Sequence, residues 1–170
     1  MDTERSALCA QVAGLTLPRW EELPDLELYM DQVLSLMERY LGAYPGYDRK
    51  GLTASMVNNY VKQGVMPPPV KKKYARIHLA HLIMICVLKG SFPIELIKNL
   101  ILSASGEMDG TGYDSFCDEF EASMRRAVEE VPDDNGLAAI GRMALRAQAS
   151  RALALRLYGA AFPPQEQNKK

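Results

Sequence analysis

The side chains best suited to chemistry in this sequence are the cations of residues 49–94. This stretch holds eight Lys and Arg residues and no Asp or Glu, a net charge of +8. Residues 1–48 carry a net charge of −6, and residues 95–170 carry −3. Cations gathered without carboxylates favour a surface that binds a polyanion. The alternative is a solvated basic face that pairs with acidic neighbours in the same molecule.

Polar side chains follow helical spacing inside this basic stretch. On a helix expected over 52–64, the apolar side carries Met56, Val57, Tyr60 and Val61 and is expected to face the core. The polar side carries Ser55, Asn58, Asn59 and Lys62.

Short polar groups on a helix can reach base edges in the major groove of DNA, where Asn pairs with adenine through two hydrogen bonds. We therefore predict base contacts from Ser55, Asn58 and Asn59. Contacts to the DNA backbone, which bring affinity without sequence information, are predicted for Thr53, Lys62, Lys71, Lys72, Lys73 and Arg76. The alternative for the two asparagines is an ordinary solvated helix surface.

Other reactive residues are too few or too scattered to indicate catalysis. His78 and His81 lie three residues apart without a third metal ligand nearby, which favours a hydrogen-bonded pair over a metal site. The acids that begin at Asp114 suit a helix N-terminus better than a catalytic site. The three cysteines lie far apart and are expected to be small buried hydrophobes. We therefore expect neither an enzyme, a metal site nor a cofactor.

The elements that must position these residues are nearly all helical. Apolar periodicity and end signals predict helices over 5–14, 25–42, 52–64, 76–89, 93–102, 113–130 and 137–158. Asp25 is the expected N-cap of the second helix; Thr53 begins the third and Gly64 ends it. Pro67–Pro69 excludes a helix there, and Val70–Tyr74 is predicted to be an exposed, extended basic arm.

The last helix is rich in Ala and Leu along several of its sides. Small residues allow close approach of a second helix, so this segment is expected to form a homodimer contact. The predicted interface residues are Ile140, Met143, Ala147 and Leu155. The alternative is a helix wholly internal to one monomer.

The order of these features resembles the MerR-type winged helix-turn-helix. The matching parts are Met56–Tyr60, Gly64–Pro67, Lys73–Arg76, Leu79–Lys89 and Gly90–Ile97. Residues of about 20–103 are similar to a bacterial domain-of-unknown-function family built on such a head. The resemblance implies an all-α fold with a winged head. Tyr74 is expected to anchor the wing; the alternative is a contact to a DNA phosphate.

The expected organisation has four parts: an N-terminal helix and connector over 1–22, a DNA-binding-like head over 23–103, a C-terminal helical region over 104–162 and a polar tail over 163–170. The corresponding function is a sequence-selective, homodimeric regulator of transcription that occupies double-stranded DNA. The alternative is a protein–protein interaction module that uses the same head without binding DNA. The N-terminus lacks the apolar region of a signal peptide, and no stretch reaches the ~20 apolar residues of a membrane span. We therefore expect a cytoplasmic protein.

Overall fold

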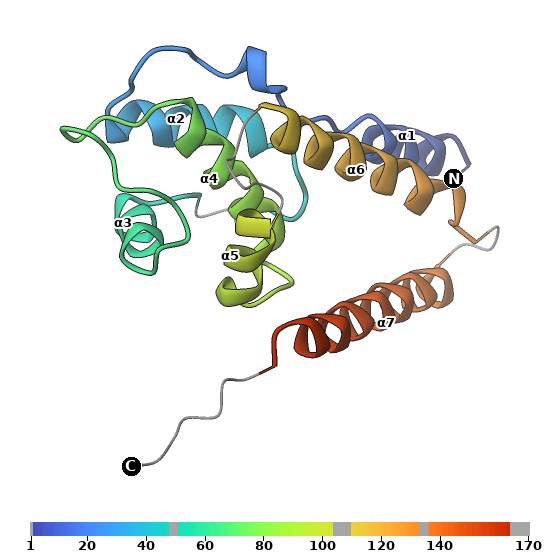
Figure 1. The fold of residues 1–170 in the computed structure, drawn as a ribbon. Coiled ribbons are helices and arrows are strands. Elements are labelled where there is room, and N and C mark those ends of the chain that lie inside the picture. Colours follow the sequence, from blue (N-terminus) through green and yellow to red (C-terminus); the bar gives the residue numbers. More distant parts are fainter. Residues whose placement is uncertain (1, 48–50, 104–109, 133–135, 164–170) are drawn as a thin grey trace. The chain divides into compact units, whose positions relative to one another are not determined.

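A computed structural model describes residues 2–47, 51–103, 110–132 and 136–163. Within these ranges the backbone is helical, with β-pairing limited to two isolated bridges. The elements in chain order (Figure 1) are α1 (Asp2–Ala13), the 3₁₀ turn η1 (Trp20–Glu22), α2 (Met30–Leu41), α3 (Ala54–Lys62), α4 (Arg76–Leu88), α5 (Ile94–Ser103), α6 (Gly110–Glu129) and α7 (Leu137–Ala161). The predicted all-α class is confirmed.

The chain divides into two compact units, Met1–Glu129 and Glu130–Lys170. Helix α6 belongs to the first unit, where it packs against α1 and η1. The first unit therefore extends beyond the boundary at residue 103 that the sequence suggested. The predicted polar tail lies outside the described residues except for its first member, Pro163.

Helix α4 forms the centre of the first unit. Nine consecutive residues, His78–Cys86, are buried, as expected for a helix that is apolar on nearly every side. Helices α2 and α5 pack against α4, and α3 packs against α2. The apolar stripe of α2, with Val33, Met37 and Leu41, faces this core. Such burial of apolar surface contributes most of the stability of a domain.

Helix α3 begins and ends at the residues that the sequence predicted. The Thr53 hydroxyl oxygen accepts a hydrogen bond from the backbone N–H of Met56 at 3.3 Å, so Thr53 is the N-cap. Gly64 adopts φ +65°, and the bonds from Gly64 N–H to the Val61 carbonyl and from Val65 N–H to the Tyr60 carbonyl complete a Schellman motif. These caps fix both ends of a helix only nine residues long.

Helix α2 begins later than predicted. Its N-cap is Tyr29, whose backbone N–H donates to Gln32 Oε1 at 2.8 Å, so the prediction of Asp25 was wrong. The reason is the backbone of Leu28, which pairs with Tyr74 and is therefore extended. As a result, Leu26 and Tyr29, which the predicted helix over 25–42 would have included, precede α2 and are exposed.

The basic arm after the prolines is a tight turn, which corrects the predicted extended conformation. Val70 and Lys73 form two reciprocal backbone hydrogen bonds of 3.1 and 2.9 Å. The two residues between them, Lys71 and Lys72, both have positive φ, at 49° and 66°. Two left-handed residues between paired positions are typical of a type I′ hairpin turn. We call residues 70–74 the wing turn.

The second unit consists of α7 together with its flanking residues. Arg146 bridges the start of this unit, because its guanidinium donates to the Glu130 carbonyl at 2.8 Å and pairs with the Glu130 carboxylate. Several large apolar side chains of α7 are exposed, among them Leu137, Ile140, Leu145, Leu153 and Leu157. Across the described residues, every helix is too short or too polar to cross a membrane.

Candidate nucleic-acid interface

The polar side of α3 is presented to solvent as the sequence pattern predicted. The four polar residues of this side are exposed: Ser55, Asn58, Asn59 and Lys62. Together with Met56 they line a shallow hollow. The opposite side docks on the core through Val57 and Tyr60, and burial raises the pKa of Tyr60 to about 12. The helix is therefore held from behind while two neighbouring amides face outward.

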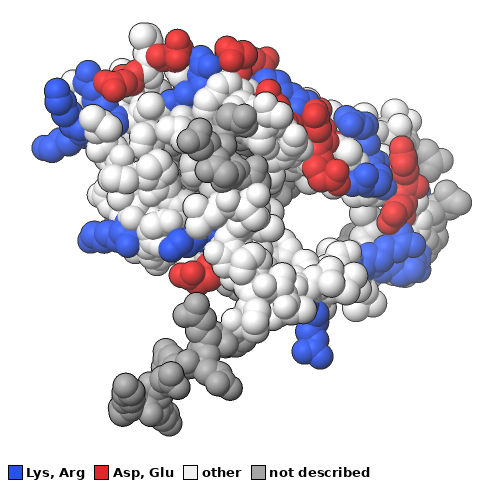
Figure 2. All heavy atoms as spheres, viewed as in Figure 1, with Lys and Arg blue, Asp and Glu red and all other residues white. Residues whose placement is uncertain are grey.

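Three of the predicted phosphate-binding lysines have their charges available. Lys62 lies in the last turn of α3, and Lys71 and Lys72 form the tip of the wing turn. All three are exposed, and none forms a salt bridge with a residue that the structure describes. Figure 2 shows basic side chains at the margin of the molecule where Figure 1 places the loop between α3 and α4, with acidic side chains close by.

The other two predicted cations are engaged inside the chain. Lys73 Nζ lies 3.5 Å from Glu27 Oε2 and 5.8 Å from the centre of the Tyr29 ring. The Arg76 guanidinium lies over the Trp20 ring and forms ion pairs with two acids, Glu21 and Asp25. The side chain of Arg76 is only 16% exposed. Lys73 and Arg76 are therefore less accessible to a phosphate than the three free lysines. Thr53, the remaining predicted backbone contact, is exposed at its capping position.

Tyr74 is buried at the end of the wing turn. The residue is 3% exposed, and it exchanges backbone hydrogen bonds of 2.8 and 2.9 Å with Leu28. Its ring meets the His78 imidazole edge to face, with the ring centres 5.5 Å apart. Burial raises the pKa of the Tyr74 phenol, so the ring stays neutral in the base of the turn.

Both histidines are buried, and their ring nitrogens lie within hydrogen-bonding distance of backbone groups. His78 Nδ1 lies 2.9 Å from the backbone nitrogen of Ala75 and 3.3 Å from the Ala75 carbonyl oxygen, and Nε2 lies 3.3 Å from the Pro68 carbonyl oxygen. His81 Nδ1 lies 2.7 Å from the Ile77 carbonyl. Among the described residues, no three His, Cys, Asp or Glu side chains are grouped closely enough to hold a metal.

Two of the three cysteines are buried, and acids of α6 bind the connector before α2. Cys86 and Cys117 are buried as predicted, whereas Cys9 is only partly buried. Burial raises the pKa of both buried thiols to about 11, which disfavours the reactive thiolate. On α6, Asp114 Oδ1 accepts a hydrogen bond from the Trp20 backbone N–H at 2.8 Å and so fixes the connector before α2.

The predicted dimer residues are all on α7. Ile140 and Ala147 are exposed, Met143 is 37% exposed and Leu155 is partly buried. Arg151 lies on the same helical arc, an ionic group that the sequence pattern had not suggested as part of an apolar face.

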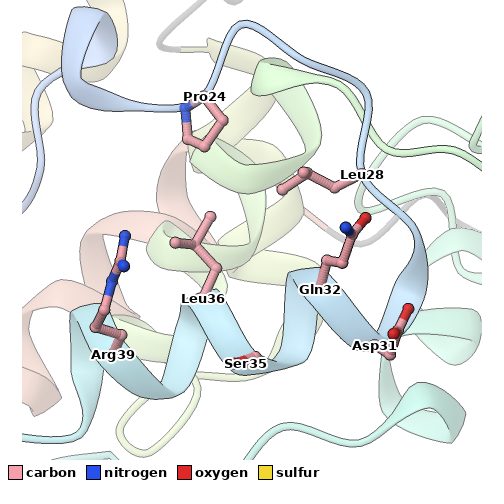
Figure 3. Close-up of a pocket in the computed structure, with 7 residues that line it drawn as sticks. All are labelled: Pro24, Leu28, Asp31, Gln32, Ser35, Leu36 and Arg39. Carbon is pink, nitrogen blue, oxygen red and sulfur yellow. The ribbon is translucent and has the colours of Figure 1, made fainter.

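A second hollow lies on the outer side of α2 (Figure 3). The helix lines this hollow with five residues, and the segment before the helix adds two. The helical residues are Asp31, Gln32, Ser35, Leu36 and Arg39, and the preceding ones are Pro24 and Leu28. Its lining mixes apolar and polar groups of both charges. It carries one cation, Arg39, and therefore has less anion-binding character than the surface of α3 and the wing turn.

Sequence reasoning missed three acids that form ion pairs beside the wing turn. Glu21, Asp25 and Glu27 come from a segment about 50 residues before the cations that they pair with. The sequence signal for these acids was the net charge of −6 over residues 1–48. This charge is compatible with pairing inside the molecule, but it does not indicate which acid pairs with which cation.

A family model described as a domain of unknown function, DUF1836, matches residues 18–118. Neither the curated proteins nor the solved structures contain a match to the chain.

Proposed function

Because the chain belongs to the DUF1836 family, whose description assigns no activity, we propose a function from the geometry of the first unit. The protein binds double-stranded DNA with sequence preference and regulates transcription by occupying its site. It carries out no chemical step on the DNA. Helix α3 is its recognition helix, and residues 70–74 are its wing, as in a MerR-like winged helix-turn-helix.

The observation that carries the proposal is the outward amide pair of α3. Asn58 and Asn59 stand on the exposed side of a short helix whose back is fixed by Val57 and Tyr60. The major groove of B-DNA admits an α-helix and displays a distinct pattern of donors and acceptors for each base pair. A capped, core-docked helix loses little conformational entropy when it enters that groove, and its amides are suited to adenine.

The three free lysines are the phosphate-binding groups in this proposal. Lys62 lies on the recognition helix, and Lys71 and Lys72 are carried by the wing turn a few residues later. Each phosphate contact releases condensed counterions from the duplex, which makes binding favourable and dependent on salt. The engaged pair, Lys73 and Arg76, contributes less because its charge is already balanced by carboxylates.

The protein acts as a homodimer in this proposal, with α7 as the subunit contact. A helix that exposes apolar side chains along several sides gains stability when a partner covers them. Two recognition helices related by a two-fold axis read half-sites separated by one turn of DNA, about 34 Å.

A salt titration of duplex binding tests the proposal. The wild-type protein is compared with a Lys62→Ala/Lys71→Ala/Lys72→Ala variant and with an Arg39→Ala/Arg125→Ala/Arg126→Ala control that removes the same charge elsewhere. We expect the wild-type affinity to fall steeply with salt and the lysine variant to flatten the slope by up to about three, since each contact contributes about one. The control keeps the wild-type slope.

Absence of duplex binding by the folded wild-type protein at low salt would overturn the proposal. The head would then serve as a protein–protein interaction module. Equal slopes for the lysine variant and the arginine control would instead show that the surface of α3 and the wing turn is not the DNA contact.

A further inference from the structure

The wing is bordered by a segment of opposite charge. We call residues 21–27 the acidic strap. Three of its four carboxylates, Glu21, Asp25 and Glu27, reach the wing, and the fourth, Glu22, accepts a hydrogen bond from the Arg19 backbone N–H at 2.6 Å. Glu21 Oε2 lies 3.4 Å from Arg76 Nη1, and Asp25 Oδ1 lies 3.5 Å from Arg76 Nη2. Glu27 Oε2 lies 3.5 Å from Lys73 Nζ. Three carboxylates of the strap thus meet the two cations at the base of the wing.

The strap is fixed in this position at both ends. At its start, Leu23 is 1% exposed, and the preceding Arg19 forms ion pairs with Asp118 and Glu121 of α6. At its end, Leu28 is joined to Tyr74 by two backbone hydrogen bonds. The backbone that carries these carboxylates therefore cannot leave the wing without breaking buried packing and backbone pairing.

The ion pairs of the strap contribute little to the stability of the fold. The side chains of Glu21 and Asp25 are 85% and 91% exposed, and that of Glu27 is also well exposed. Exposed pairs of this kind are weak because water screens them. Their electrostatic effect on an approaching polyanion is larger, since each carboxylate cancels a cation and repels phosphate at the same place.

We infer that the acidic strap competes with DNA phosphates for Lys73 and Arg76. By pairing with these two cations, the strap limits the affinity of the protein for DNA. This inference rests on the proposed function. The strap leaves Lys62, Lys71 and Lys72 as the cations open to phosphate. Binding then depends more on the contacts of α3 with bases and less on indiscriminate attraction to any duplex, so the strap favours specific over non-specific sites.

Neutralising the strap tests the inference. A Glu21→Gln/Asp25→Asn/Glu27→Gln variant is titrated with a scrambled duplex at several salt concentrations. We expect roughly tenfold tighter binding at 0.1 M salt for each cation that gains a phosphate, together with a salt slope steeper by about one to two. A Glu4→Gln/Glu119→Gln/Glu129→Gln variant removes the same charge from exposed sites on α1 and α6 and is expected to bind within about threefold of the wild type.

A double-mutant cycle then locates the effect at the wing. Lys73→Gln is expected to change the affinity of the wild-type protein little, because Glu27 already balances that lysine. In a Glu27→Gln background the same change is expected to cost up to about tenfold at 0.1 M salt, the contribution of one freed phosphate contact. Thermal melts of all variants confirm that they are folded.

The outcomes separate the two proposals. If the wild type binds DNA and the strap variant binds no tighter than the charge-matched control, the inference is wrong and the proposed function stands. If Lys73→Gln costs the same in both backgrounds, Glu27 does not compete with phosphate. If neither the wild type nor the strap variant binds any duplex, the proposed function fails and the inference fails with it.

Discussion

Leu28 and Tyr74, 46 residues apart, exchange two backbone hydrogen bonds of 2.9 and 2.8 Å. This single antiparallel bridge joins the segment before α2 to the end of the wing turn. It delays the start of α2, places the acidic strap beside Lys73 and Arg76, and fixes the base from which Lys71 and Lys72 project. The charge distribution of the interface therefore depends on one backbone pairing.

The asparagines of α3 are expected to determine sequence preference. Asn58→Ala or Asn59→Ala should cost about 1–3 kcal/mol on the preferred duplex and little on a scrambled one, because a lost base contact removes discrimination. Lys62→Ala should weaken binding to both duplexes nearly alike. Binding is measured on selected and scrambled duplexes at one salt concentration. Equal losses on both duplexes for the asparagine variants would show that they do not read bases.

The two lysines at the tip of the wing turn are expected to lower the stability of the fold while they supply positive charge for DNA binding. A Lys71→Asn/Lys72→Gly variant places the preferred type I′ residues at the two positions with positive φ. We expect a stability gain of about 1 kcal/mol, because left-handed backbone costs roughly that much for a lysine, together with weaker DNA binding. Urea unfolding and duplex titration measure the two effects. Lower stability would contradict the turn geometry, and unchanged affinity would remove its lysines from the interface.

Gly110 is expected to be required where Trp20 packs on the start of α6. A Cβ at position 110 would lie 2.7 Å from Trp20 Cδ1, so Gly110→Ala should cost about 1–3 kcal/mol through overpacking. Gly141→Ala in α7 is the matched control, since a Cβ there meets no described atom within 4 Å. The control should be neutral or stabilising by up to about 1 kcal/mol. Chemical denaturation followed by circular dichroism distinguishes the two.

His81 is expected to make folding stability depend on pH. Burial lowers its pKa in the folded protein below the ordinary value of 6.5. As pH falls through 6.5, the unfolded chain takes up a proton that the folded protein does not, so the free energy of unfolding decreases. The loss stops growing below the folded-state pKa. Urea unfolding at pH 7.5 and 5.5 should show a smaller decrease for His81→Leu; an identical decrease would rule out this role.

Leu155→Glu tests the subunit contact on α7. If α7 forms the dimer, a charge in its apolar interface should shift the protein to monomer, because the carboxylate would have to be desolvated. Leu153→Glu, on the opposite side of the helix, is the control and should leave the dimer intact. Sedimentation velocity at micromolar concentration measures both. A monomeric wild-type protein would exclude the dimer at once.

The sequence by itself determined the features that depend on neighbours along the chain. Helical periodicity predicted the seven helices, and the types of Thr53 and Gly64 predicted both ends of α3. The alternation of apolar and polar sides on α3 predicted that Tyr60 is buried while Asn58 and Asn59 are exposed. These signals are local, because caps and side-chain faces are set within one or two turns.

Only the tertiary structure decided which charges remain available. Lys71, Lys72 and Lys73 are identical in type and adjacent in sequence, yet Lys73 pairs with Glu27, whereas Lys71 and Lys72 are exposed at the tip of the turn. Arg76 likewise finds Glu21, Asp25 and Trp20, more than 50 residues earlier. Such pairings leave no local pattern, because they form when packing and the Leu28–Tyr74 bridge bring distant segments together. The type of a residue determines its charge, whereas the fold determines whether that charge pairs with a carboxylate or stays exposed to solvent.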